Sequence, residues 1–390
     1  MSSHSPSRSD RARIGIVGTG FIARGLSTLM RTTTDLAVNR VLTRRSLDSI
    51  AHFEASLLTH SVDDLLAHSD LIVECSGDII HASNVVDAAL GAGLPVVTMN
   101  AEFHLTVGSY FCNLGVLTEA QGDQPGSLAA LHEEVVSMGF RPLVYGNIKG
   151  FLNHDPSETD MEFWAAKNGI SVPQVTSFTD GTKLQVEQAL VANGLGAGIV
   201  QRGMLGLRDL SLADATLALG QEAKSHGSAI CEYVLNPNLP AGVFIVAEHP
   251  TERPEVLRYL KLGDGPFYTL LRPYHLCHLE LPLTIRRVLE GRGPLLNNSS
   301  RPGVNVVAVA KRDLPAGHLI ETGIGGREVR GEGVSFAACG DAPPIGLLSG
   351  ARLRHSVEAG QTLALSDVDI PDSLAKRAWE STLALMHVSA

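Results

Sequence analysis

A glycine-rich loop between an apolar strand and a helix constrains the fold of this chain more than any other feature. The loop Gly18-Thr19-Gly20-Phe21-Ile22-Ala23 directly follows the apolar run 13–17 and opens a segment of helical spacing. Gly18 permits a tight turn, Gly20 lets the backbone approach a pyrophosphate, and Ala23 lets the helix pack close to the strand. The free N–H groups at the helix start favour phosphate. This context predicts a dinucleotide site rather than a plain glycine-rich turn.

Strand-like and helix-like segments alternate after this loop. A βαβαβ order with short connections implies right-handed crossovers and a parallel sheet. We therefore expect an α/β fold with a Rossmann domain at residues 12–125. The segments that carry this pattern are Leu36–Leu42, Ser61–His68, Leu71–Cys75, His81–Ala92 and Leu94–Thr98.

The end of the second strand bears on the choice of cofactor. NAD-preferring sites usually place an acid there, to bind the ribose 2′-hydroxyl. This chain has Thr43-Arg44-Arg45-Ser46 instead. Two guanidinium groups suit a 2′-phosphate, so we predict NADP(H), although two solvated surface arginines are the alternative. Ser76, Gly77 and Asn100 follow the next strands and complete the predicted cofactor site by their position.

Composition excludes several classes of function. The chain has 390 residues and a formal net charge of −10, which argues against a nucleic-acid partner. No stretch approaches the ~18 apolar residues of a membrane span. Residues 1–11 read as a disordered tail without the apolar run of a secretory signal, and the five scattered cysteines have no CxxC spacing. We expect a cytoplasmic protein with a small-molecule substrate.

The pattern changes twice after the first domain. Residues 126–300 mix helices with apolar strands, as expected for an α+β catalytic domain, and the turn-rich stretch 297–303 reads as a linker. Residues 301–390 read as a small, mostly β module, with strand-like segments at 304–310, 345–354 and 361–365 and a closing amphipathic helix at about 372–387.

Polar clusters in the middle region are hard to explain by packing alone. Each follows an apolar strand, opens a helix or stands at a domain junction. They are Gly122-Asp123-Gln124-Pro125, Asn147 with Lys149, Asp180-Gly181-Thr182-Lys183 with Glu187 and Asn193 downstream, and Arg272-Pro273-Tyr274-His275 with Glu280.

These blocks together resemble one family. VECSGD, GDQP, SFTDGTK with VANG, FIVAEH, RPYHL…LEL and AKRDLPAGHLI…PIGLLSG…VEAGQTL are similar to the 1-deoxy-D-xylulose 5-phosphate reductoisomerase-like proteins, over residues 12–372. The Rossmann domain of that family is similar to that of homoserine dehydrogenase, and its last module resembles the SAF fold. The chain departs from the family in its arginine pair after the second strand and in its shorter length. It departs from homoserine dehydrogenases in having no lysine shortly after the strand at 96–99.

The resemblance implies an NADPH-dependent rearrangement and reduction of a phosphorylated ketose in isoprenoid biosynthesis, by a homo-oligomer. Carried over by motif, the expected catalytic positions are Lys149, Asp180, Lys183, His275 and Glu280, with Thr182 beside them.

The chemistry suggests a role for each. A buried lysine such as Lys183 can donate to a developing oxyanion, and His275 can shuttle a proton near neutral pH. Lys149 or Arg272 would suit a substrate phosphate. Mg²⁺ or Mn²⁺ could chelate substrate oxygens through Asp180, Glu187 or Glu280, although no DxD or HxH spacing points to a metal. A solvated Lys149, a core His275 and acids held in structural hydrogen bonds are the alternatives.

Three hypotheses therefore stand. The first is a reductoisomerase acting on 1-deoxy-D-xylulose 5-phosphate or a related small hydroxy-carbonyl compound. The second is a simple NADP-dependent reductase or dehydrogenase of a small aldehyde, ketone or hydroxy acid. The third is a non-catalytic NADP-binding sensor.

Overall fold

The computed structural model describes residues 11–387, so the predicted tail at 1–11 lies almost wholly outside the described residues. The first part of the chain is a six-stranded, wholly parallel sheet of order β3-β2-β1-β4-β5-β6, which confirms the predicted Rossmann fold. Its strands are β1 (Ala12–Val17), β2 (Leu36–Leu42), β3 (Leu58–Thr59), β4 (Leu71–Glu74), β5 (Val96–Thr98) and β6 (Leu117–Glu119).

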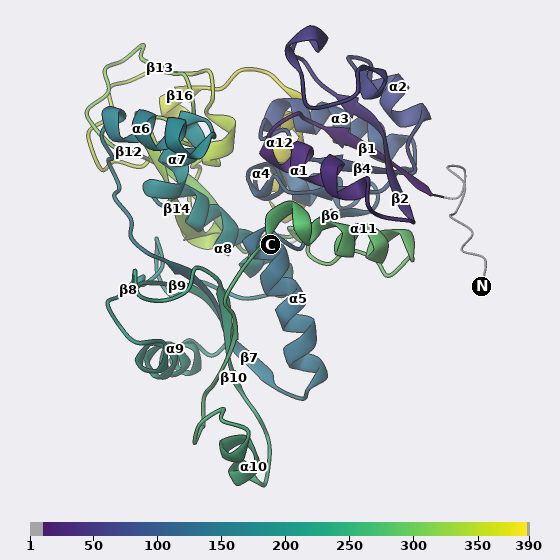
Figure 1. Cartoon of the computed structure of the whole chain (residues 1–390). Helices are drawn as coiled ribbons and strands as arrows, with labels where there is room; N and C mark the ends of the chain where they lie inside the picture. The colour runs from purple at the N-terminus through teal and green to yellow at the C-terminus, as the bar shows by residue number, and fades with distance from the viewer. Residues whose placement is uncertain (1–10, 388–390) are drawn as a thin grey trace, which may run out of the picture.

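Helices pack on both faces of this sheet, as the buried, almost continuously apolar strands require (Figure 1). They are α1 (Phe21–Met30), α2 (Val62–Ala67), α3 (Ile79–Gly91) and α4 (Ala101–Phe111). Later segments join the same layers. Helix α11 (Leu281–Leu289) shares a core with α1, and α12 (Leu374–His387) packs through Trp379 against α3 and α4.

The middle region is a mixed five-stranded sheet of order β11-β10-β7-β9-β8. Its strands are β7 (Arg141–Lys149), β8 (Leu207–Arg208), β9 (Ile230–Leu235), β10 (Val243–Glu248) and β11 (Tyr268–Arg272). Val243, Ile245 and Ala247 of β10 face one core, whereas Phe244 and Val246 face another. This alternation is the period of two of a strand buried on both faces.

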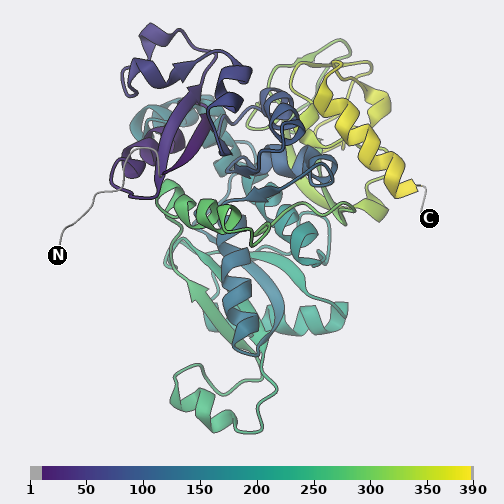
Figure 2. The same cartoon turned by 90° about the vertical axis from the view of Figure 1, so that its right-hand side faces the viewer.

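The two faces of the middle sheet have different covers. Helices α5 (Gln124–Ser137) and α8 (Thr182–Leu195) cover one face, and α9 (Leu212–His226) covers the other. A hairpin of α6 (Glu158–Asn168) and α7 (Val172–Thr179) precedes α8. The short α10 (Pro254–Tyr259) lies in the β10–β11 connection, which projects away from the body (Figure 2).

The last region contains two small antiparallel sheets, β12-β14 and β13-β15-β16. The strands are β12 (Val304–Ala310), β13 (Leu319–Ile320), β14 (Val329–Ser335), β15 (Ala351–Leu353) and β16 (Val368–Asp369). The continuous strand predicted at 345–354 is wrong, because Ile345–Leu347 is a buried 3₁₀ turn against α4 and only Ala351–Leu353 is a strand. Residues 361–365 contribute a single bridge at Thr362 instead of a named strand.

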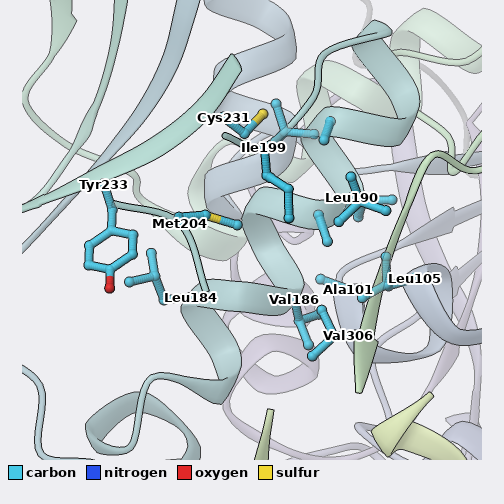
Figure 3. Close-up of a cluster of buried hydrophobic side chains, with 14 of the residues drawn as sticks. Ala101, Leu105, Leu184, Val186, Leu190, Ile199, Met204, Cys231, Tyr233 and Val306 are labelled. Carbon is cyan, nitrogen blue, oxygen red and sulfur yellow. The ribbon is translucent and has the colours of Figure 1, made fainter. Parts of the chain in front are cut away.

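Helix α8 lies at the centre of the largest core. Figure 3 shows Leu184, Val186 and Leu190 of α8 packed among side chains of α4, β9 and β12. A helix buried on all sides is held rigidly, because side chains on every face are locked by packing. Any polar group on α8 is therefore precisely oriented. Within residues 11–387 no helix combines the length and the apolar character needed to cross a membrane.

Candidate active site

The glycine loop has the backbone that a dinucleotide site needs. Gly18 has φ +110°, and its N–H donates to the Leu42 carbonyl at 3.0 Å. A Cβ at Gly18 would lie 3.0 Å from both the Cys75 carbonyl oxygen and the Ser76 Cα. Only glycine combines this left-handed conformation with so close an approach of two strand ends.

The start of α1 is open to a ligand. Gly20 caps α1 without a side-chain hydrogen bond, and a Cβ built on it would meet no atom within 4 Å. Ala23 is fully buried, as expected for the position where the helix packs on the sheet, while the neighbouring Phe21 is exposed. Gly18 and Thr19 lead into this helix start, where Phe21 and Ile22 present uncapped N–H groups beside the open space at Gly20, which fits a pyrophosphate.

The end of β2 places the arginine pair at the surface. The Thr43 hydroxyl is buried and accepts a hydrogen bond from the Arg45 N–H at 3.1 Å, which fixes the turn. The Arg44 side chain is 63% exposed, and its Nη2 lies 2.6 Å from Asp78 Oδ2. Asp78 belongs to the loop after β4 and was not among the predicted site residues.

Asp78 is held in its charged form. Its Oδ1 accepts from the His81 N–H at 2.9 Å, which caps α3. Burial raises the pKa of Asp78, but the His81 N–H and the Arg44 guanidinium outweigh burial, so the pKa lies below its usual range.

The remaining predicted cofactor residues surround a buried carboxyl group. Glu74 is fully buried and accepts hydrogen bonds from the Ser76 N–H at 2.8 Å and the Thr98 hydroxyl at 3.1 Å. Burial raises its pKa, against the opposing effect of these donors. Gly77 has φ +71° with open space around it. Asn100 caps α4 through Oδ1, and its side chain also hydrogen-bonds to Glu74, which opposes the rise in the pKa of Glu74.

Lys183 lies within a group of acidic side chains. Its Nζ is 3.1 Å from Glu102 Oε2, 3.6 Å from Asp123 Oδ2 and 3.9 Å from Glu187 Oε1. Glu102 comes from α4, Asp123 from the start of α5, and Glu187 from α8. The Rossmann domain and the middle region therefore meet at the Lys183 ammonium group. Only 10% of the Lys183 side chain is exposed.

This environment decides the protonation state of Lys183. Burial lowers its pKa, but Asp123, Glu102 and Glu187 outweigh burial and raise the pKa well above its usual range. Lys183 is therefore a fixed ammonium at neutral pH. A fixed cation can donate a hydrogen bond to developing negative charge on oxygen, whereas it cannot act as a base.

A second network lies beside it, at the end of β7. Gln124 Oε1 accepts from Lys149 Nζ at 2.7 Å and from Asn147 Nδ2 at 2.8 Å. Glu187 Oε2 accepts from Asn147 Nδ2 at 3.2 Å and lies 3.6 Å from Lys149 Nζ. Burial raises the pKa of Glu187 although both lysines oppose it, which makes its carboxyl group a candidate proton donor or acceptor.

Two buried atoms of this network lack a hydrogen bond within the described residues. They are Asp123 Oδ2 and Asn147 Oδ1. Buried polar atoms are nearly always hydrogen-bonded in native proteins, so atoms without partners mark places where a ligand or water completes the site. Asp123 Oδ2 is also one of the acidic oxygens around Lys183, so the two networks form one candidate site.

The segment 272–280 contacts the residues that precede Asp123 in this candidate site. His275 is half-buried, and its charge affects Glu187. Glu280 accepts from the Leu276 N–H at 2.6 Å and from Gln121 Nε2 at 3.3 Å, and it lies 3.8 Å from Arg272 Nη1. These contacts indicate that Glu280 orders the segment that carries His275.

Asp180 is placed differently from the other predicted catalytic residues. Its Oδ2 forms an ion pair with Lys311 Nζ at 2.7 Å, and its Oδ1 accepts from the Thr182 N–H at 2.9 Å. Lys311 Nζ also donates to the Gly326 carbonyl at 2.9 Å. Both side chains are essentially unexposed, so this ion pair joins the start of α8 to the last region of the chain.

A further buried pair lies between α4 and β6. His104 Nδ1 is 2.8 Å from Glu119 Oε2, and both side chains are fully buried. Burial lowers the pKa of His104 to about 3 and raises that of Glu119 well above its usual range. Burial therefore favours the uncharged form of each group.

The acids proposed for a metal do not come together. Asp180 is held by Lys311, Glu280 by a backbone N–H, and Glu187 by two lysines and an amide. Across residues 11–387, no three or more histidine, cysteine or acidic side chains form a group placed to hold a metal ion.

Several functional candidates were missed or underweighted from the sequence. The GDQP block pointed to Asp123 and Gln124, but their contacts with Lys183 and Lys149 depend on the packing of α5 against β7 and α8. Asp78 and Lys311 lie in the VECSGD and AKRDLPAGHLI blocks, but their roles could not be predicted from these blocks, because each acts through a partner distant in the sequence.

Two family models match the chain. Residues 122–281 match "Oxidoreductase DRL, catalytic domain", and residues 18–109 match "Homoserine dehydrogenase, NAD binding domain". The match to the NAD binding domain begins at the glycine loop. The match to the DRL catalytic domain spans the candidate site from the GDQP block to Glu280. The protein is an NAD(P)-binding oxidoreductase. No curated protein gives a significant match to this chain.

Solved structures resemble the oxidoreductase at low identity. A probable dehydrogenase from Thermotoga maritima is 14% identical, with a TM-score of 0.44 over 73% of this chain and 91% of its own. UDP-N-acetylglucosamine 3-dehydrogenase from Acidithiobacillus ferrooxidans is 12% identical, with a TM-score of 0.42 over 74% and 92%. A homoserine dehydrogenase from Thiobacillus denitrificans is 20% identical, with a TM-score of 0.32 over 45% and 43%.

Proposed function

We propose that this oxidoreductase uses NADP(H) to rearrange and reduce 1-deoxy-D-xylulose 5-phosphate or a related small hydroxy-carbonyl compound. The observation that carries the proposal is the charged Lys183, fixed on a buried helix within the segment that matches the DRL catalytic domain. The preference for NADP(H) rests on Arg44 and Arg45 at the end of β2, where an acid would favour NAD(H).

Each side chain of the candidate site has its own role in the proposed reaction. The reduced nicotinamide supplies a hydride to the carbonyl carbon when it is bound. Lys183 donates a hydrogen bond to the carbonyl oxygen and stabilises the negative charge that develops on it. Glu187, whose pKa is raised, exchanges a proton with the substrate hydroxyl, and His275 beside it connects that proton to solvent.

An anionic group on the substrate would bind at Lys149. Its ammonium is held 2.7 Å from Gln124 Oε1 and keeps 25% of its side chain exposed. A partly exposed ammonium still has donors for phosphate oxygens. Mg²⁺ or Mn²⁺ in the reaction stays a prediction from the resemblance. The boundaries 12–125, 126–300 and 301–390 and a cytoplasmic location stay predictions from the sequence pattern and composition. The SAF-like identity of the last region and a homo-oligomer stay predictions from the resemblance.

A simple NADP-dependent reductase or dehydrogenase of a small aldehyde, ketone or hydroxy acid is the second candidate. It is favoured by the engagement of Asp180 with Lys311, which leaves Lys183, Glu187, Lys149 and His275 as the groups that we propose to act on a substrate. These groups are sufficient for reduction of a carbonyl without rearrangement of the carbon skeleton.

The test follows NADPH oxidation with 1-deoxy-D-xylulose 5-phosphate and Mg²⁺ or Mn²⁺, with NADH in parallel and product identified by NMR. Lys183→Met should lower turnover by about 100- to 1000-fold while NADPH binding is retained. Lys224→Met, which removes an exposed lysine of the same segment, is the matched control and should be unaffected.

The outcomes separate the three hypotheses. A rearranged and reduced product supports the reductoisomerase. A reduced product with the original skeleton supports the simple reductase, and so does turnover only with other small carbonyl compounds. Tight NADPH binding without turnover of any carbonyl compound would indicate a sensor.

A further inference from the structure

An ion pair joins the loop after β2, where a Rossmann fold binds the adenosine ribose, to the loop after β4. Arg44 lies directly after β2, and Asp78 lies in the loop after β4 at the start of α3. Their side chains meet at 2.6 Å, with Arg44 Nη2 as donor and Asp78 Oδ2 as acceptor. The other Asp78 oxygen accepts a hydrogen bond from the His81 N–H.

The position of this pair matters for cofactor choice. In the Rossmann fold the ribose of the adenosine lies at the end of the second strand, where an acid binds a 2′-hydroxyl or an arginine binds a 2′-phosphate. Here the arginine that should bind the phosphate is already bound to a carboxylate. A 2′-phosphate must therefore compete with Asp78 for Arg44, and it must bind close to the negative charge of Asp78.

We propose that Asp78 is a specificity-determining residue that opposes NADP(H), because it neutralises Arg44 in the free protein and repels the adenosine 2′-phosphate. A cofactor with a 2′-hydroxyl has no phosphate to compete for Arg44, so Asp78 leaves its affinity unchanged. Asp78 thereby reduces the preference for NADP(H) over NAD(H) that Arg44 and Arg45 create. This inference rests on the proposed preference for NADP(H).

The size of the effect follows from charge and exposure. The Arg44 side chain is 63% exposed and that of Asp78 33% exposed, so the interaction is screened by water. A single charge a few ångströms from a phosphate in such a setting changes affinity by about three- to tenfold.

The decisive variant is Asp78→Asn. Asparagine caps helices as well as aspartate does, so its Oδ1 can still accept from the His81 N–H while the charge is removed. The dissociation constants of NADPH and NADH are measured by calorimetry at fixed low ionic strength. We expect NADPH to bind about three- to tenfold more tightly to this variant and NADH to bind as it does to the wild type.

Asp70→Asn is the matched control. Asp70 forms an ion pair of the same length with Arg13 at the amino ends of β1 and β4, whereas Arg44 and Asp78 lie beyond the carboxyl ends of strands in the same sheet. This variant therefore removes one charge without touching the cofactor site. It should leave both dissociation constants unchanged. Thermal unfolding of Asp78→Asn checks that α3 remains capped.

Arg44→Ala separates this inference from the proposed function. If Arg44→Ala weakens NADPH but not NADH, the NADP(H) preference is supported, and unchanged or weaker NADPH binding by Asp78→Asn would overturn the role of Asp78 alone. If Arg44→Ala leaves NADPH binding unchanged, the assignment of Arg44 is wrong and the inference falls with it. A loss of NADH binding by Asp78→Asn would also overturn it, because Asp78 would then bind the ribose.

Discussion

The ion pair between Asp180 and Lys311 should be among the most costly interactions to break in this protein. Lys311→Met removes the ammonium but keeps an unbranched stem of similar length. Asp180 would then be a buried carboxylate whose remaining contact is the Thr182 N–H. The side chains of Asp180 and Lys311 are 0% and 1% exposed, so water cannot replace the lost partner.

Removing one partner of a buried ion pair typically costs about 3–5 kcal/mol. We expect Lys311→Met to lower the free energy of unfolding by this amount, measured by urea titration of the full chain. The double variant Asp180→Asn/Lys311→Met leaves no unpaired charge. It should recover about 2 kcal/mol or more of the loss, which a double-mutant cycle detects as coupling.

The same variants test whether Asp180 has a chemical role. If the pair only anchors the start of α8, the double variant should turn over substrate at a rate near that of the wild type. A loss of less than about 1 kcal/mol by Lys311→Met would refute the structural role of the pair. Additive losses in the double variant would refute it as well, and a stable but inactive double variant would show that the Asp180 carboxylate takes part in the reaction.

Three further predictions concern a ligand loop, a tight contact and a buried acid. Gly20→Ala should keep the unfolding midpoint of the wild type, because its Cβ meets no atom, yet calorimetry should show NADPH binding weakened by at least about tenfold, since the methyl group blocks the pyrophosphate. Gly126→Ala should destabilise the fold by about 1–3 kcal/mol or prevent folding, because its Cβ would overlap the Ala120 carbonyl oxygen. Gly91→Ala, where a Cβ would have open space, is the control. Thermal melts should show no change in stability for the Gly91 variant. Burial raises the pKa of Glu232 from 4.5 to about 7, so the folded protein holds the Glu232 proton more tightly than the unfolded chain does. The free energy of unfolding should therefore fall as pH rises from 4.5 to 7. Urea titrations across this range should show a shallower fall for Glu232→Gln than for the wild type.

The first sheet could be predicted from the sequence because its signals are local. Apolar strands separated by amphipathic helices and a glycine loop are readable within a few tens of residues. The positions of α11 and α12 could not be predicted in the same way. Both helices return to the first sheet from much later in the chain, and an amphipathic pattern shows that a face is buried without showing against what. The strand expected at 345–354 failed for a related reason, because a short apolar run fits a buried turn as well as a strand.

The candidate site shows the same division. Motifs identified Lys149 and Lys183, because a lysine after a strand or at a helix start is visible in the sequence. Their partners were harder to predict. Lys183 contacts Glu102, which lies 81 residues earlier, and Arg44 contacts Asp78 from a different loop. The pair of Arg44 and Asp78 arises from the sheet order, which brings the carboxyl ends of parallel strands together, whereas the pair of Lys183 and Glu102 arises from the packing of α8 against α4.

The side chains of Lys183 and Lys311 are both buried, and they differ in a way that separates structure from function. Lys311 has a short contact to one carboxylate and another to a carbonyl, so its ammonium is well satisfied. Lys183 has a single hydrogen bond, to Glu102, and two longer contacts, and Asp123 Oδ2 at one of them has no hydrogen bond. A purely structural ion cluster would be expected to close these distances, because burying charge is costly unless it is well paired. The loose arrangement around Lys183 leaves a donor and an acceptor for a substrate that carries both a carbonyl oxygen and a hydroxyl group, as the proposed hydroxy-carbonyl compounds do.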